Sequence, residues 1–220
     1  MNVQKTAIRR LARAVLAFAV LAFFGSAVPP SPGTQEAPEP ARTGRAKTPA
    51  QDAGLESQAR RLLSSAQVAE ALGNYAVSLK LCTEALALDG LQVAEQAELL
   101  ITRGLSFYFL GSPDEAVGDW TRVIELPGAP AGQVARALVN RGVTWDEKGE
   151  TDKALADYTR VIEQLPGAPV EQVAKALYNR GVTWGQKGET EKELADYTRV
   201  IEQLPGAPVG QVAKIGRAHV

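Results

Sequence analysis

The chain has 220 residues, with 24 lysine and arginine residues against 25 aspartate and glutamate residues. This balance gives no electrostatic reason to expect a nucleic-acid partner. The single cysteine, Cys82, excludes an internal disulfide framework and a multi-cysteine metal site, and we expect its thiol to be buried and unreactive.

Residues 1–27 have the pattern of a secretory signal peptide. Basic residues up to Arg13 precede the apolar stretch Ala14–Phe24, and small residues follow at positions 25–27. The apolar stretch is shorter than the roughly 20 residues that span a bilayer, so we expect cleavage. The protein would then be exported, to the periplasm or the extracellular space. The alternative is a membrane anchor formed by an uncleaved N-terminal helix.

The segment 28–54 is rich in proline and alanine and has no apolar periodicity. Such a composition cannot bury enough apolar surface to offset the entropy lost on ordering. We therefore predict a disordered linker that holds the rest of the chain away from a membrane or a cleavage site.

Residues 55–212 consist of internal repeats. Residues 135–173 and 174–212 are identical at 32 of 39 aligned positions, and residues 101–130 form a more divergent copy. A period of this length is typical of a solenoid, in which each unit buries its apolar face by stacking on a neighbour. This architecture favours an extended binding surface over a catalytic pocket. The expected units are residues 59–92, 97–130, 135–168 and 174–207.

Each unit is expected to contain two antiparallel helices. In the last unit, apolar residues at helical spacing predict a first helix over 170–187 and a second helix over about 191–204. A connection as short as Gly188–Thr190 requires the two helices to pack antiparallel. We expect Gly181 to permit close approach where they cross.

The pattern of small and aromatic residues resembles the tetratricopeptide repeat. The third unit matches the family motif with Gly142, Trp145, Gly149, Ala154, Tyr158 and Pro166. The resemblance covers residues 55–212 and implies an all-α solenoid of antiparallel helix pairs, wound into a right-handed superhelix. We expect Trp145 and Trp184 to fill the space between paired helices.

Two features depart from the family pattern. Glu193 occupies a position in the second helix of the fourth unit that the family gives to a small residue, which indicates looser packing there. The period is 39 residues instead of 34, and the additional residues lie in proline-glycine connections such as Pro166–Val170.

An arginine in the first helix and an aspartate in the second occur together in three units and are both missing from the first unit, which has Ser65 and Leu81. This joint occurrence predicts an ion pair within each unit, with a structural role. The pairs are Arg103 with Asp119, Arg141 with Asp157, and Arg180 with Asp196.

The resemblance also implies where a ligand would bind, because the concave surface of this family is lined mainly by the first helices. Asn140 and Asn179 are suited to an extended peptide, since an amide both donates and accepts hydrogen bonds. The alternative is a solvated helix face with hydrogen bonds between units. The residues with which chaperone-binding members hold a C-terminal carboxylate are absent. The candidate peptide-binding residues are Ile101, Leu105, Tyr108, Val139, Asn140, Val143, Glu147, Tyr178, Asn179, Val182 and Gln186.

The periodicity stops after Lys214. Residues 215–220 read Ile-Gly-Arg-Ala-His-Val, which the start of a common sequencing adapter encodes in one reading frame before a stop codon. We therefore expect a truncated gene joined to adapter sequence, and the alternative is a genuine tail. On this interpretation His219, the only histidine, is not a catalytic or metal-binding candidate.

The remaining sequence contains no nucleophile elbow, phosphate-binding glycine loop or metal-ligand cluster, so we expect neither an enzyme nor a cofactor. The favoured function is a bacterial scaffold that binds a protein or peptide on its concave surface outside the cytoplasm. It would contact a membrane only through an uncleaved signal segment. The alternative is that the repeats are the N-terminal part of a larger exported enzyme or transport-complex component whose functional domain is missing through truncation.

Overall fold

A computed structural model describes residues 49–203, and all regular secondary structure in this range is helical. The expectations for the signal peptide, for most of the linker and for residues 215–220 lie outside the described residues. Within 49–203, no helix has the length and apolar character needed to span a membrane. The helices are α2 (Pro49–Ala71), α3 (Tyr75–Leu86), α4 (Val93–Phe109), α5 (Pro113–Glu125), α6 (Ala131–Glu147), α7 (Thr151–Thr159), α8 (Val170–Gln186) and α9 (Thr190–Gln203), and a π-helical turn (Arg160–Gln164) continues α7.

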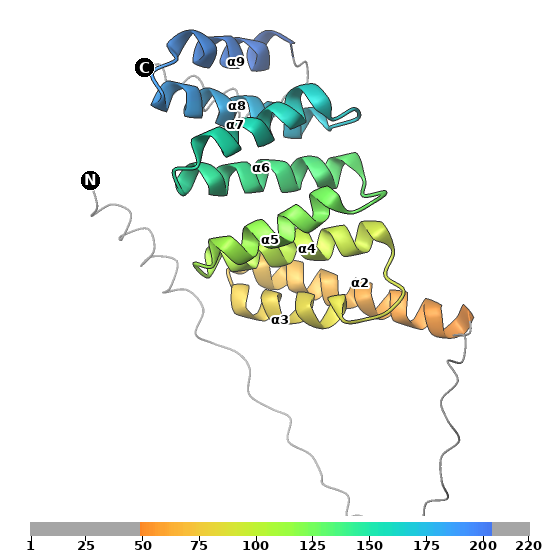
Figure 1. Cartoon of the computed structure of the whole chain (residues 1–220). Coiled ribbons are helices and arrows are strands. Elements are labelled where there is room, and N and C mark those ends of the chain that lie inside the picture. Colours follow the sequence, from red (N-terminus) through yellow and green to blue (C-terminus); the bar gives the residue numbers. More distant parts are fainter. Residues whose placement is uncertain (1–48, 204–220) are drawn as a thin grey trace, which may run out of the picture. The chain divides into compact units, whose positions relative to one another are not determined.

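The helices form four antiparallel pairs that stack in chain order (Figure 1). The pairs are α2 with α3, α4 with α5, α6 with α7, and α8 with α9. This arrangement confirms the predicted all-α solenoid of helix pairs.

The stacking also defines the concave side of the array. The first helices α2, α4, α6 and α8 contact each other from unit to unit, whereas the described second helices do not contact one another. Because neighbouring units approach most closely on the side of the first helices, the array curves toward that side. The first helices therefore line the concave surface.

The first helix begins earlier than the sequence indicated. Helix α2 starts at Pro49, so the end of the segment 28–54, which we expected to be linker, is helical. Proline is favoured in the first turn of a helix, and the residues that follow it are mostly alanine, glutamine and other helix formers.

In each of the last three units, a glycine of the first helix packs directly against an aromatic ring of the second helix. A Cβ atom added to Gly142 would lie 2.6 Å from Cε1 of Tyr158, which is closer than real contacts allow. Gly181 packs in the same way against Tyr197, as predicted for this crossing. The rings involved are buried, and they belong to Trp120, Tyr158 and Tyr197.

Trp145 and Trp184 do not fill the space between paired helices as we expected. Both are only partly buried, because the aromatic ring of the second helix already occupies that space. A lysine lies over each tryptophan instead. The Nζ atom of Lys153 is 4.6 Å from the ring centroid of Trp145, and that of Lys192 is 4.4 Å from Trp184. The two tryptophans thus make cation–π contacts at the edges of units three and four.

At the equivalent position in unit three Ala154 is fully buried, whereas Glu193 is only partly buried. Its carboxylate lies over Gly185, where an added Cβ would be 2.7 Å from Oε2. In the preceding unit the two equivalent positions hold Asp146 and the buried Ala154. In unit three the acidic residue is on the first helix and the small residue on the second, and in unit four the order is reversed. Gly185, which has no side chain, leaves room for the carboxylate of Glu193.

The three predicted ion pairs are present. In each of them, Nε and Nη2 of the arginine donate to the two carboxylate oxygens of the aspartate, at distances between 2.6 and 2.8 Å. The carboxylates of Asp119, Asp157 and Asp196 are almost fully buried. Bidentate geometry and burial make these pairs fixed structural links between the two helices of a unit.

Candidate protein-interaction surface

In each of α6 and α8, four side chains lie on one face of the helix, on the concave side. In α6 they are Arg136, Asn140, Val143 and Glu147, and their spacing of three or four residues places them on one face. None of the four is fully buried, whereas the other faces of α6 pack against neighbouring helices. The equivalent residues of α8 are Lys175, Asn179, Val182 and Gln186.

An apolar row runs across three units of this face. Leu105, Val143 and Val182 occupy the same position in α4, α6 and α8, and each is partly exposed. Next to the row lie Asn140 and Asn179. Among the described residues, neither of these two amide side chains has a hydrogen bond to another part of the chain. The structure thus offers no hydrogen bond between units for these amides, which leaves them accessible to a ligand.

Two residues that we expected on this surface are in the core. Ile101 has an exposed fraction of 0% and Val139 one of 5%, because their side chains turn toward the next unit and are covered by it. Tyr178 holds the same position in α8 and remains partly exposed. Which residues face the next unit depends on how the units cross, and the sequence pattern alone does not specify that angle.

Tyr108 and Glu147 are brought together by the stacking of two units. The hydroxyl of Tyr108 donates to the Glu147 carboxylate at 2.7 Å. Burial and the adjacent carboxylate raise the pKa of Tyr108 to about 12. These two candidate residues therefore link α4 to α6, and a ligand would have to compete with that bond.

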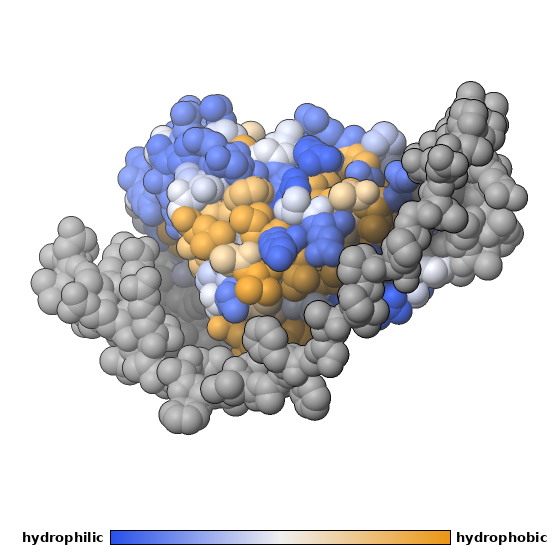
Figure 2. Space-filling model, turned by 90° about the horizontal axis from the view of Figure 1, so that it is seen from below, coloured by the Kyte–Doolittle hydropathy of each residue, from blue (hydrophilic) through white to orange (hydrophobic). Residues whose placement is uncertain are grey.

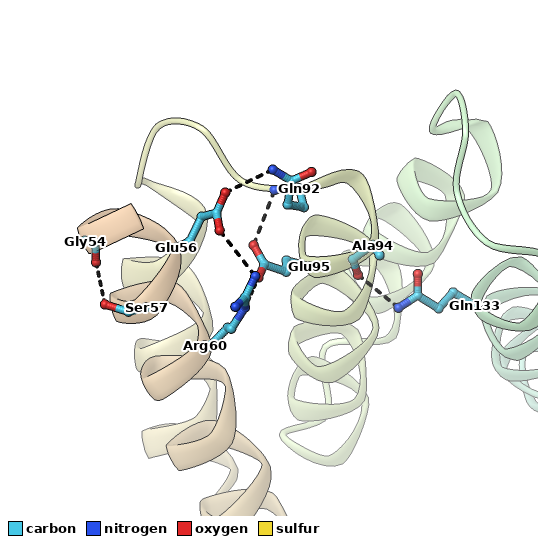
Figure 3. A network of polar contacts seen from close by, with 8 residues as sticks. All are labelled: Gly54, Glu56, Ser57, Arg60, Gln92, Ala94, Glu95 and Gln133. Carbon is cyan, nitrogen blue, oxygen red and sulfur yellow. Dashed lines mark hydrogen bonds and ion pairs between the residues drawn. The ribbon is translucent and has the colours of Figure 1, made fainter. Parts of the chain in front are cut away.

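Two arginines of the first helices pair with glutamates of the neighbouring first helix. Arg60 of α2 donates to Glu95 of α4 at 2.6 Å, and Figure 3 shows Arg60 between Glu56 and Glu95. One unit further on, Arg136 donates to Glu98 at 2.8 Å. Arg136 was absent from our sequence-based set, although its spacing of four residues before Asn140 places it on the same face.

Residues 49–203 contain no cluster of metal ligands and no exposed thiol. This range contains no group of three or more histidine, cysteine, aspartate or glutamate side chains that could hold a metal ion. Cys82 is fully buried, and burial raises the pKa of its thiol to about 12. A shallow pocket beside α7 includes Asp152 and Asp157, but these carboxylates are already paired with Lys187 and Arg141.

Comparison with protein families supports the same interpretation. Residues 101–169 match the tetratricopeptide repeat, and helix pairs of the same kind lie on both sides of this match. We therefore identify residues 101–169, which include most of the second and third units, as tetratricopeptide repeats. Such repeats typically bind protein partners and are typically non-catalytic. A comparison with curated proteins found no match to the chain.

Proposed function

We propose that the concave face formed by α4, α6 and α8 binds an extended segment of a partner protein outside the cytoplasm. The observation that carries this proposal is the apolar row of Leu105, Val143 and Val182 beside the unbonded amides of Asn140 and Asn179. Apolar side chains of the partner would pack on the row, and the amides would bond to its backbone.

The geometry of the array limits which peptides fit. Packed helices lie about 8–10 Å apart, and an extended strand advances about 3.3 Å per residue. A peptide that crosses the first helices therefore passes from one unit to the next in roughly three residues. We expect the preferred sequence to carry an apolar residue at about every third position.

Charge should contribute little to this recognition. On the concave face, Arg136 is held by Glu98, and Lys175 is held by Glu171 at 2.6 Å. A partner would have to displace one of these carboxylates to gain an ion pair, so the exchange brings little net free energy. We therefore expect binding that depends only weakly on salt concentration.

Selection of random peptides against the protein, followed by affinity measurement, tests the proposal. Asn140→Ala combined with Asn179→Ala should weaken selected peptides roughly tenfold or more, since each hydrogen bond contributes about 1 kcal/mol. The matched control combines Glu125→Ala with Arg160→Ala, two exposed positions on second helices, and should leave affinity unchanged. Peptides that bind the asparagine variant normally but lose affinity for the control would place the site on the opposite face.

The location outside the cytoplasm is proposed from the signal-peptide pattern of residues 1–27. Mass spectrometry of the protein from a fractionated bacterial host examines it separately. We expect a mature chain that begins at Val28 in the exported fraction. An intact N-terminus in the cytoplasmic fraction would contradict the location without affecting the binding face.

A further inference from the structure

The spacing of the concave face matches one conformation of a bound peptide. Leu105, Val143 and Val182 recur once per unit, and packed helices lie about 8–10 Å apart. In a β-strand, side chains on one face recur every second residue, which is about 6.6 Å, so they fall out of step with this row. In a polyproline II helix they recur every third residue, which is about 9 Å. Of the two conformations, only polyproline II presents one apolar side chain to each unit.

The hydrogen-bonding groups of this face suit the same conformation. A polyproline II helix forms no hydrogen bonds within its own backbone, so its carbonyl groups are free to accept bonds from another chain. The side chains of Asn140 and Asn179 are partly exposed, and no hydrogen bond within residues 49–203 engages their amides. An α-helical segment bonds its own backbone groups and would leave both amides without a partner.

A stack of aromatic rings extends the face beyond the apolar row. Phe109 lies one helical turn after Leu105 on α4, and its side chain is 53% exposed. Its ring stacks on Tyr75 of α3, with the ring centroids 4.5 Å apart and an angle of 15° between the planes. Figure 2 shows hydrophobic surface at the end of the array formed by α2 and α3. Surfaces lined by aromatic rings bind proline-rich segments, which reach them already extended.

The aromatic stack gives the face a direction. Glu147 and Gln186 occupy the position of Phe109 in α6 and α8, so among these three helices the exposed ring lies on α4. A proline of the bound segment that stacks on this ring would therefore lie at the end near unit two. Such a segment needs no charge, which agrees with a face whose Arg136 and Lys175 are already paired.

We propose that the concave face binds proline-rich segments in the polyproline II conformation, with an apolar residue at every third position on the apolar row and a proline on Phe109. This inference rests on the proposed binding face and names the class of its partner. Because proline has no N–H group, the hydrogen bonds run from Nδ2 of Asn140 and Asn179 to carbonyl oxygens of the segment.

Fluorescence anisotropy with labelled peptides and the 220-residue chain tests the inference. The probe consists of four Leu-Pro-Pro triplets. One control consists of six Leu-Pro pairs, which keep the length and the conformation but place successive leucines on different sides. A second control of four Leu-Gly-Ser triplets keeps the spacing of the leucines in a flexible chain. We expect the probe to bind at least about tenfold more tightly than either control, because it is in register with the row and already extended.

Substitutions examine the two contacts. Asn140→Asp combined with Asn179→Asp keeps the acceptor oxygens but removes the donors, and should weaken the probe about tenfold or more. Phe109→Ala removes the ring and should weaken it about fivefold or more. Val77→Ala, which shortens another exposed apolar side chain on α3, should leave the affinity unchanged. Circular dichroism checks that every variant keeps the helix content of the parent.

The outcomes separate this inference from the proposed face. No binding of the probe, or equal affinity for the three peptides, would overturn the proline-rich partner. So would a loss of affinity with the alanine pair of asparagine variants that the aspartate pair does not reproduce, because the bonds would then come from N–H groups of the peptide. In either case, randomly selected peptides that depend on the two asparagines would still support the face. Probe binding that neither pair weakens would contradict the face itself.

Discussion

Units three and four have nearly the same sequence but different neighbours, so each is a control for the other. Unit three is packed between units two and four, whereas unit four is packed only against unit three among the described residues. The second helices share Leu155–Gln164 and Leu194–Gln203 residue for residue. In unit three this segment ends in a π-helical turn over Arg160–Gln164, while in unit four the same residues continue the α-helix to Gln203. Local propensity is identical in the two segments, so the neighbouring unit accounts for the difference.

The contacts of Arg180 with Thr159 and Glu163 of the preceding unit show where that influence acts. Arg180 bonds to Glu163 inside the π-helical turn, and within residues 49–203 the equivalent Glu202 has no such bond. Single π-helical turns inside α-helices are rare, and here the turn coincides with a contact from the next unit. We therefore infer that the interfaces between units determine the stability and the backbone geometry of this array. Matched substitutions in the two units measure how much each interface contributes.

The largest difference is expected for the buried aspartates. Asp157→Ala should destabilise the array by about 3–5 kcal/mol, because it leaves the partly buried Arg141 with a hydroxyl partner only. Asp196→Ala should cost about 1–3 kcal/mol, because Arg180 keeps Glu163 as a counter-ion. Urea unfolding followed by circular dichroism measures both. An equal loss in the two variants would show that Glu163 does not stabilise Arg180.

The second pair concerns an apolar side chain in two environments. Leu155→Ala should cost about 2–4 kcal/mol, as expected for a buried leucine that leaves a cavity between units. Leu194→Ala removes a half-exposed side chain and should change the free energy of unfolding by less than about 1 kcal/mol. Thermal melts of the two variants at equal concentration provide the comparison. A large loss for Leu194→Ala would mean that its face is covered in this chain.

The third pair concerns the close crossing of the two helices. Gly142→Ala and Gly181→Ala each place a Cβ atom 2.6 Å from a tyrosine ring carbon, so both should destabilise by overpacking. We expect about 1–3 kcal/mol for Gly142→Ala, since neighbouring units hold both helices of unit three in place. The effect of Gly181→Ala should be smaller because α9 can shift outward. Urea midpoints test this order, and the opposite order would contradict the view of unit four as the more adaptable unit.

The sequence allowed much of this fold to be predicted. The repeat, the helix pairs, the close crossing at Gly181 and the three arginine–aspartate pairs all followed from spacing and from joint occurrence. Residues within one unit are related by short sequence separations and a helix crossing that the motif implies. The pattern therefore carries enough information to place them.

Contacts between units were harder to predict. Ile101 and Val139 were expected to face a ligand, yet the next unit covers them. The acidic residue is Asp146 on the first helix of unit three but Glu193 on the second helix of unit four, and the contact between Glu193 and Gly185 explains this change. Both depend on how one helix crosses another, which a periodic pattern leaves open. The binding role of Asn140 and Asn179 stays a prediction.

The smallest expected difference lies in the titration of the two core tyrosines at high pH. Burial raises the pKa of Tyr197 to about 12, and burial raises the pKa of Tyr158 further still. A folded-state pKa above the unfolded value of about 10 means that the folded chain holds the proton more tightly. The resulting stability is present below pH 10 and is lost as the pH rises through the folded-state pKa.

Absorbance at alkaline pH, compared between Tyr158→Phe and Tyr197→Phe, assigns each ionisation. We expect the Tyr197 phenol to ionise first, before the array unfolds, because its unit is packed on one side. Ionisation of Tyr158 should occur only together with loss of helix content, and its ionisation in a chain that is still folded would show that unit three opens independently of its neighbours.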